Sequence, residues 1–337
     1  MQHGSRWGAV AVAAALVVGA CSGSVTSTQA PTVPASAAPS AAASAAPPAA
    51  ASAAAPAASS AAASYVPSTT VPSGVVPALQ ALVPASAKSS GELTVGSGLN
   101  FPPYTFKNAA GTATGIEPDL VNMIGQMLGL KVVYSQLQFP ALLPSLQNGR
   151  NEIGLDQLAD TPAREQAVNF VDYLKGADSL LVKPGNPTHI SVNDLCGHTL
   201  AVVTGTVEVT LMQSDTKACT AAGKPAIKLL VLGDSSTQFL AVQNGRADAA
   251  PVEVAVAAYL AQHSNGQTAT LNAVLPGLGY TVGIAVSKSS GLTNAIEASV
   301  QQIMADGQYQ KLLATWHDTL DAVNHVAVND PNLWNGQ

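Results

Sequence analysis

Two short segments of the sequence, far apart in the chain, share the motif QNGR and a similar pattern of residues around it. LQNGRNEI at 146–153 and VQNGRADA at 242–249 each read as a helix end, a glycine and a short strand. Glycine is common just after a helix because it adopts the left-handed conformation without strain. An acidic residue follows each strand, Asp156 after the first and Glu253 after the second. QNGR could alternatively be no more than a common sequence at the end of a helix. The motif occupies an equivalent place in both halves of the chain, however, and this favours two similar lobes.

Strands and helices alternate around both copies, which indicates an α/β fold with parallel strands. Open sheets of this kind bind ligands at the carboxyl ends of their strands, so Asp156 and Glu253 should face a shared cleft. The strands are expected at 93–97, 131–134, 153–155, 199–203, 227–232 and 280–286, and the main helices at 77–87, 116–128, 140–148, 235–244 and 292–306.

The segment from Ile153 to Tyr173 carries the main candidate for ligand binding. Thr161 followed by Pro162 suits a helix start, since threonine caps the first turn and proline fits the first helical position. Arg164 then lies in the first turn, next to a polar strand end. Its guanidinium matches a carboxylate with two parallel hydrogen bonds. We therefore predict a carboxylate receptor; a solvated surface arginine is the alternative.

The N-terminal part of the chain has the composition of an export signal followed by a stalk. Residues 1–21 combine a basic start, a short apolar run and small residues before Cys21, which is typical of a secretory signal. Cys21 also resembles the acylated cysteine of bacterial lipoproteins; an ordinary signal peptide that contains a cysteine is the alternative. Residues 22–75 are mostly Ala, Ser and Pro and carry no charge, so we predict a disordered stalk.

Charge and cysteine content narrow the possible partners. A formal net charge of −6, without a cluster of lysines or arginines, argues against nucleic acid. Cys196 and Cys219 are the only cysteines after Cys21, and an isolated pair in an exported protein indicates one disulfide. A two-cysteine metal site is the alternative, although no histidine lies at ligand spacing. No cofactor is expected.

The sequence resembles solute-binding protein family 3, the polar amino-acid receptors of bacterial ABC importers. The resemblance covers about 77–320, and the Cys196–Cys219 region resembles lipid-anchored members from high-GC Gram-positive bacteria. It is carried by GELTVG with the following FPPY, by GIEPDL, FPALLPSLQNGRNEIGLD, DTPAREQAVNFVDY and the Gly205-Thr206 turn, and by QNGRADAAPVEVA and DGQYQKLLATW.

The resemblance implies a type II periplasmic-binding-protein-like fold, with two parallel-type sheets joined by two crossing strands near Leu180–Pro184 and Tyr280–Ile284. Lobe 1 would comprise 76–183 with 281–325, and lobe 2 would comprise 184–280. Residues 326–337 would form a C-terminal tail. The protein would be a monomer that closes on a small ligand and delivers it to a membrane permease from the outer face of the membrane, held there by the lipid on Cys21.

The resemblance also implies a role for individual residues. Arg164 would hold the ligand's α-carboxylate, aided by backbone N–H groups near Gln157 and Val207 at a helix start. Glu253 would bind the α-ammonium group. The remaining candidates for the ligand site are Phe101 as a stacking platform, Phe139 as a pocket wall, and Asp156, Ala159, Thr206 and Glu208.

Departures from the family pattern leave the ligand open. Ala159 lacks a hydroxyl that members of the family often use, and Asp156 either faces a cationic ligand, is paired internally or points out of the cleft. The sequence favours a basic or polar amino acid or a related amine. No catalytic motif is visible, so we expect a receptor and not an enzyme; a sensor subunit and a dehydratase-like enzyme are the alternatives.

Overall fold

The structure is a computed structural model that describes residues 65–271, 273–277 and 279–336. These residues belong to one compact unit, Ala62–Gln337. The predicted signal peptide, Cys21 and the predicted stalk from 22 to 64 lie outside the described residues. Among the helices of the described part, none is both long enough and apolar enough to cross a membrane.

One mixed sheet of ten strands runs through this unit, in the order β5-β1-β6-β12-β7-β10-β8-β9, with β11 and β13 paired to β7. A small sheet of β2, β3 and β4 lies apart from it. The strands of the main sheet are β1 (Glu92–Ser97), β5 (Lys131–Gln136), β6 (Ile153–Gly154), β7 (Asn169–Val182), β8 (Thr199–Val203), β9 (Lys228–Leu232), β10 (Ala249–Glu253), β11 (Ala269–Thr270), β12 (Gly279–Val286) and β13 (Ala322–Val328), and those of the small sheet are β2 (Asn100–Phe101), β3 (Thr105–Lys107) and β4 (Ala113–Thr114).

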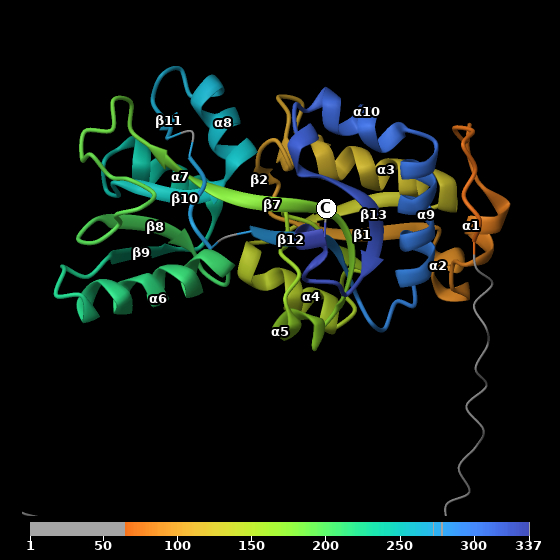
Figure 1. Ribbon diagram of the computed structural model, residues 1–337. Helices are drawn as coiled ribbons and strands as arrows, with labels where there is room; N and C mark the ends of the chain where they lie inside the picture. The colour runs from red at the N-terminus through yellow and green to blue at the C-terminus, as the bar shows by residue number, and fades with distance from the viewer. Residues whose placement is uncertain (1–64, 272, 278, 337) are drawn as a thin grey trace, which may run out of the picture. The chain divides into compact units, whose positions relative to one another are not determined.

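Helices pack on the sheet in two groups, which form two lobes (Figure 1). One lobe contains β1, β5 and β6 with α3, α4, α9 and α10, and the other contains β8 to β11 with α6, α7 and α8. The helices are α1 (Pro77–Ala81), α2 (Ala85–Ser90), α3 (Ile116–Leu128), α4 (Leu142–Gln147), α5 (Pro162–Glu165), α6 (Val207–Ala221), α7 (Ser235–Gln243), α8 (Val254–His263), α9 (Thr293–Ala305) and α10 (Gln308–Thr315), with short 3-10 turns η1 (Phe139–Ala141), η2 (Thr319–Asp321) and η3 (Leu333–Gly336).

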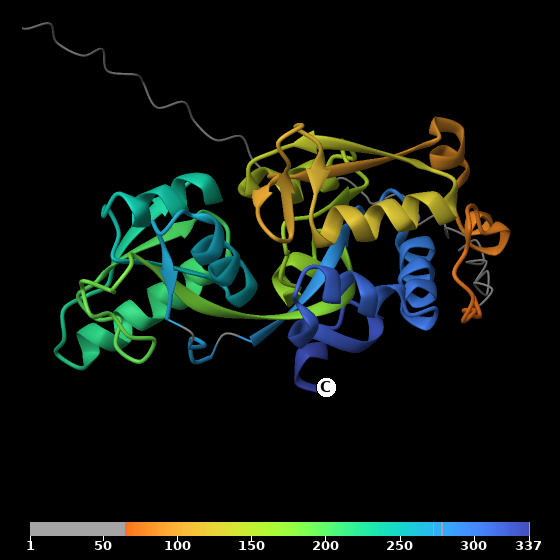
Figure 2. The same cartoon turned by 90° about the horizontal axis from the view of Figure 1, so that it is seen from above.

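Strand β7 joins the two lobes (Figure 2). It pairs with β12 up to Ala177 and with β10 from Asp178 onward, so it changes partner between these two residues. This point comes before the predicted crossing at Leu180–Pro184. Within each lobe the strands pair in parallel, β1 with β5 and β6, and β8 with β9 and β10. The predicted two-lobed α/β fold with crossing strands is therefore confirmed.

The duplicated QNGR unit has the predicted local structure in both lobes. Helices α4 and α7 end just before the two glycines, and Gly149 and Gly245 have φ angles of 71° and 74°. Strand β6 then runs parallel to β1, and β10 runs parallel to β8. Both strand ends therefore point to the region between the lobes.

The folded part of the chain extends beyond two predicted boundaries. Before residue 76, the Tyr65 hydroxyl and the Ser68 N–H donate to Gln302 Oε1 of α9, at 2.6 and 2.8 Å. After residue 325, β13 continues to Val328 along β7, and the Trp334 N–H donates to Thr281 Oγ1 at 3.2 Å. Sequence-distant contacts thus order part of the predicted stalk and part of the predicted tail. The boundary between the two lobes by residue range stays a prediction.

Cys196 and Cys219 form the predicted disulfide, which excludes the two-cysteine metal site. The bond ties the segment before β8 to the last turns of α6 within one lobe.

Replacing both cysteines by serine should lower the free energy of unfolding by about 3 kcal/mol, because the bond closes a loop with a sequence separation of 23. Urea unfolding of the double variant, with and without reductant, measures the loss. The wild type should become less stable in reductant, and the double variant should not respond. Equal stability of the oxidised wild type and the double variant would contradict the prediction.

Candidate ligand-binding site

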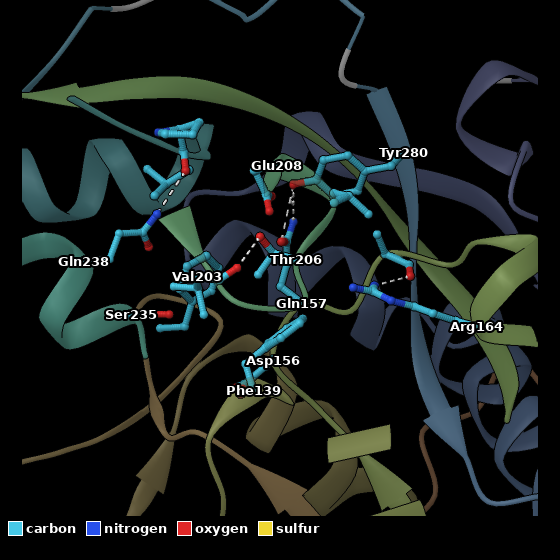
Figure 3. A pocket seen from close by; sticks show the side chains of 15 residues that line it. Phe139, Asp156, Gln157, Arg164, Val203, Thr206, Glu208, Ser235, Gln238 and Tyr280 are labelled. Carbon is cyan, nitrogen blue, oxygen red and sulfur yellow. Dashed lines mark hydrogen bonds between the residues drawn. The ribbon is translucent and has the colours of Figure 1, made fainter. Parts of the chain in front are cut away.

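A pocket with an empty volume of about 520 Å³, partly open to solvent, lies between the two lobes. All the predicted ligand-binding residues except Glu253 line it, although their role in binding stays a prediction. Figure 3 shows the side chains around the pocket. The lining residues are Phe101, Phe139, Asp156, Gln157, Ala159, Arg164, Val203, Thr206, Val207, Glu208, Ser235, Gln238, Pro251, Val252 and Tyr280.

Arg164 reaches from α5 to both walls of the pocket. Thr161 caps α5 as predicted, since its hydroxyl accepts from the Arg164 N–H at 3.3 Å. Arg164 Nη1 donates to the Ala159 carbonyl at 2.6 Å, and Nη2 donates to the Gly205 carbonyl of the other lobe at 3.0 Å. Burial lowers the pKa of Arg164, while the Glu208 and Asp160 carboxylates oppose this shift. The guanidinium is therefore held in place, with further N–H donors available for a carboxylate.

Phe139 supports the arginine, and a second aromatic residue lines the pocket at the small sheet. The Arg164 guanidinium carbon lies 5.6 Å from the centre of the Phe139 ring, within the range of a cation–π contact. Phe101 stacks between Tyr104 and Phe239, with ring centres 6.3 and 6.2 Å away. These contacts fix two apolar faces of the pocket.

The N-terminus of α6 opens into the same pocket. Thr206 is the N-cap residue, but its hydroxyl donates to the Val203 carbonyl at 3.0 Å and makes no side-chain cap bond to the helix. The leading N–H groups of a helix have no partner within the helix and carry partial positive charge. Because Thr206 and Val207 line the pocket beside Arg164, this end of the pocket favours an anion.

Glu117 of α3 holds the turn that follows β6. Its carboxylate accepts from the Asp156 N–H at 3.0 Å, from the Gln157 N–H at 2.9 Å and from the Tyr173 hydroxyl at 3.2 Å. Asp156 and Gln157 both have positive φ angles, of 134° and 52°, which few residues adopt without support. Burial raises the pKa of Glu117 to about 7, although the three hydrogen bonds lower it. The Gln157 N–H therefore donates to Glu117 in this structure, and ligand binding by N–H groups near Gln157 stays a prediction.

Asp156 lines the pocket, yet it is paired internally. Its two carboxylate oxygens accept from the Ser97 hydroxyl at 3.1 Å and from the Gly98 N–H at 2.7 Å. A Cβ atom on Gly98 would lie 2.7 Å from the Asp156 carboxylate, so this close approach requires glycine. The sequence left three alternatives for Asp156: it could face a cationic ligand, be paired internally or point out of the cleft. The structure shows the internal pairing.

Glu253 does not line the pocket. It is 1% exposed and caps α8, where its Oε2 accepts from the Ala255 and Val256 N–H groups at 2.6 and 3.1 Å. Glutamate at the strand end is one bond longer than aspartate, and it folds back onto the helix that follows directly. Its Oε1 is buried without a hydrogen-bond partner among the described residues, and the contact between Glu253 and the ligand's ammonium group stays a prediction.

Beyond its cap, Glu253 contributes to a carboxyl cluster between the lobes, which we define as Glu253, Asp318 and Asp321. The Tyr104 hydroxyl donates to Asp318 Oδ2 at 3.0 Å and lies 3.4 Å from Asp321 Oδ2. Burial and the neighbouring Asp321 carboxyl raise the pKa of Asp318 to about 9. Burial and the two aspartates also raise the pKa of Glu253.

This carboxyl cluster should make the protein less stable as the pH rises from about 5 to 9. The folded protein keeps a proton on Asp318 up to a pKa of about 9, whereas the unfolded chain releases it near its ordinary pKa of about 4. Stability falls with pH wherever the folded state holds more protons. Urea unfolding at several pH values should show a smaller loss for Asp318→Asn than for the wild type or for the exposed control Asp194→Asn. Equal losses in all three proteins would contradict this.

Several residues that line or support the pocket could not be identified from the sequence. Glu117 lies in the first turn of a helix, where acidic residues are common for local reasons, so nothing in the sequence marked it as a support for the site. Tyr280 was expected only as part of a crossing strand. Among the described residues, no group of His, Cys, Asp or Glu is arranged to hold a metal ion. The pocket residues missed are Val203, Ser235, Gln238, Pro251, Val252 and Tyr280.

The chain is similar in sequence and in fold to several known proteins. The sequence profile of the bacterial extracellular solute-binding proteins, family 3, matches residues 93–319. The arginine-binding protein ArgT of Corynebacterium glutamicum is 31% identical over 77% of this chain and 84% of its own. An ancestral arginine-binding protein solved with arginine is 31% identical, with a TM-score of 0.59 over 67% of this chain and 98% of that one. An ancestral amino acid-binding protein described as a precursor of cyclohexadienyl dehydratase is 27% identical, with a TM-score of 0.56 over 68% and 97%.

Proposed function

Because this chain belongs to the bacterial extracellular solute-binding proteins of family 3, we propose that it captures an amino acid between its two lobes and delivers it to an ABC importer. The observation that carries the proposal is the position of Arg164. Its guanidinium is bonded to one lobe at Ala159 and to the other at Gly205, beside the open N-terminus of α6. A carboxylate bound there would touch both lobes, so binding would favour the closed state.

The ligand of this proposal is a basic or polar amino acid. Glu208 lines the pocket together with Arg164, so a carboxyl group and a guanidinium group both face a bound ligand. The relative from Corynebacterium glutamicum is named as an arginine-binding protein, which supports the basic class. Phe101 and Phe139 add flat apolar faces suited to the stem of a long side chain or to a guanidinium group.

The proposed role is binding without catalysis. The relative from Corynebacterium glutamicum is named for binding, and the neighbour linked to a dehydratase is itself described as an amino acid-binding protein. A sensor subunit would use the same site and the same closure. The two roles can be distinguished by the gene next to the one that encodes this protein: a permease gene would support import, and a receptor kinase gene would support sensing.

Calorimetric titration with the common amino acids, including L-arginine, L-lysine, L-histidine and L-glutamine, tests the proposal. At least one should bind, and small-angle scattering with that ligand should show a smaller radius of gyration, because closure accompanies binding. Citrulline and ornithine extend the panel to further polar and basic amino acids. Binding of none of these compounds would refute the proposal.

We further propose that the mature protein is anchored through a lipid on Cys21, with the predicted stalk as a tether. Cys21→Ser should move the protein from the membrane fraction to the medium, because acylation requires the thiol. Fractionation followed by immunoblotting measures this, with Cys196→Ser/Cys219→Ser as a control that keeps Cys21. A Cys21→Ser protein that remains in the membrane fraction would exclude the anchor.

A further inference from the structure

An aromatic contact joins the two lobes outside the ligand pocket. The rings of Phe106 on β3 and Tyr259 on α8 have centres 5.7 Å apart and planes inclined at 55°. Neither residue lines the pocket. Helix α8 lies beside the small sheet in both views of the fold (Figures 1 and 2). The contact is therefore separate from the hydrogen bond between Arg164 and Gly205, which joins the lobes at the pocket itself.

The Phe106 ring is fixed on the lobe that contains α3 and α10. Strand β3 belongs to this lobe, because Thr105 Oγ1 lies 3.0 Å from Ser97 Oγ of β1. Side chains alternate between the two faces of a strand, so Phe106 points the other way. There its ring meets the edge of Trp316 at the end of α10, with ring centres 5.9 Å apart and planes at 86°. Trp316 is held in turn, since its Nε1 donates to Asp119 Oδ2 of α3 at 3.0 Å.

The Tyr259 ring is fixed on the other lobe. Residues four apart on a helix lie on the same face, and His263 follows Tyr259 at this spacing. The two rings stack with centres 3.9 Å apart and planes at 16°. His263 Nδ1 also lies 2.8 Å from the Tyr259 carbonyl oxygen. Each lobe thus presents one ring that is supported from behind by residues of its own lobe.

The contact between these two rings exists only while the lobes lie together. Phe106 and Tyr259 are half-buried in the structure, and separation of the lobes would expose the facing sides of both rings to water. Removal of apolar surface from water is favourable, and a pair of aromatic rings adds a further attraction. The pair therefore stabilises the closed state without any contribution from a ligand.

We propose that Phe106 and Tyr259 form a clasp that holds the two lobes closed and so raises the affinity for every ligand, although neither residue touches the ligand. The clasp itself stands apart from the proposed function, whereas its effect on affinity rests on that function. A ligand that binds only the closed state binds more tightly in proportion to the closed population. The clasp residues would thus set affinity, and the residues that line the pocket would set selectivity.

A double-mutant cycle in the full chain tests the clasp. Phe106→Leu and Tyr259→Leu each replace a ring with an aliphatic side chain, and each should raise the Kd about two- to tenfold, the range expected for the loss of one aromatic pair. The double variant should bind about as weakly as either single variant, because both substitutions remove the same contact. Calorimetry measures the Kd, and stopped-flow experiments should show that the ligand dissociates faster from all three variants.

Two controls separate the clasp from a general loss of structure. Tyr259→Phe keeps the ring and should bind like the wild type, as should Gln262→Ala, which changes an exposed residue of the same helix. The ratio of the affinities for L-arginine and L-glutamine, or for any two amino acids that bind in the calorimetric panel, should be the same in the wild type and in the clasp variants. Phe101→Leu, which changes a ring of the pocket itself, should alter this ratio.

A second measurement follows the clasp without a ligand. In protein labelled with fluorotyrosine, the fluorine NMR signal that is missing from Tyr259→Phe belongs to Tyr259. Phe106→Leu should shift this signal in the ligand-free protein, because the Phe106 ring reaches Tyr259 only across the space between the lobes. Ligand at saturation should enlarge the difference between Phe106→Leu and the wild type, since it increases the closed population.

The possible failures are distinguishable. If the double variant weakened binding by the product of the two single effects, the two rings would act separately and the clasp would be excluded. A Tyr259 signal that Phe106→Leu leaves in place, with and without ligand, would also exclude it. A wild type that binds no amino acid would refute the proposed function, and the clasp would then be decided by the Tyr259 signal of the ligand-free protein alone.

Discussion

Replacing Arg164 by alanine should weaken amino acid binding by at least about a hundredfold, with the fold intact. The variant removes two or more charge-assisted hydrogen bonds to the ligand carboxylate, and each such bond contributes about 1.5–3 kcal/mol. It also removes the bond from Nη2 to the Gly205 carbonyl, which joins the two lobes. Affinity should therefore fall both because the carboxylate loses its partner and because the closed state loses a contact.

Arg164→Lys separates charge from geometry. Lysine keeps the positive charge but cannot offer two parallel N–H donors, so its affinity should fall between those of the wild type and Arg164→Ala. Arg150→Ala and Arg246→Ala are matched controls, because these exposed arginines occupy the same place in the two QNGR units. Calorimetry measures the affinities, and thermal unfolding checks the fold. An Arg164→Ala protein that binds as tightly as Arg150→Ala would exclude the carboxylate role.

Replacing Glu117 by alanine should cost about 4 kcal/mol of stability and disorder the turn beneath the pocket. The buried N–H groups of Asp156 and Gln157 would lose their acceptor, at about 1–3 kcal/mol each, and the Tyr173 hydroxyl would lose its partner as well. Asp156 and Gln157 would also lose what holds their positive φ angles. Ligand binding should weaken in proportion, since both residues line the pocket.

Glu117→Gln is the matched variant, because the amide oxygen still accepts hydrogen bonds while the NH₂ group replaces one acceptor with a donor. Its loss of stability should be smaller than that of Glu117→Ala. Because the pKa of Glu117 is about 7 in the folded protein and about 4.3 in the unfolded chain, the wild type should lose stability relative to Glu117→Gln as the pH rises from about 5 through 7. Urea unfolding of the three proteins at pH 6 and pH 8 measures both effects. If Glu117→Ala were as stable as the wild type, the turn at Asp156 and Gln157 would not depend on Glu117.

Local features of the fold could be predicted from the sequence because they depend on neighbouring residues. The glycine after each QNGR helix, the Thr161 cap and the expected strand at 199–203 all follow from backbone preferences within a few residues, and the structure confirms them. The Cys196–Cys219 bond followed from the number of cysteines and the export signal.

Elements that depend on distant partners were missed or misplaced. Strand β13 forms because β7 offers a free edge to the last part of the chain, which no local pattern reveals. Tyr65 and Ser68 bind Gln302 through hydrogen bonds between residues more than 230 positions apart in the sequence. β7 itself is long because it pairs with one partner after another, and its point of crossing depends on where β12 ends and β10 begins.

The candidate site divides in the same way. The sequence by itself determined the two-lobed family and its carboxylate-binding candidate, Arg164. Both could be recognised because the order of the motifs and the residues that start a helix can be read directly from the linear chain. Only the tertiary structure decided which carboxyl groups are free to meet a ligand. Asp156 has donors for both of its oxygens, Glu253 has donors for one of them, Glu117 supports a turn, and Glu208 lines the pocket. A carboxylate binds a ligand only where no nearer donor has taken its oxygens, and that depends on which chain segments folding brings together.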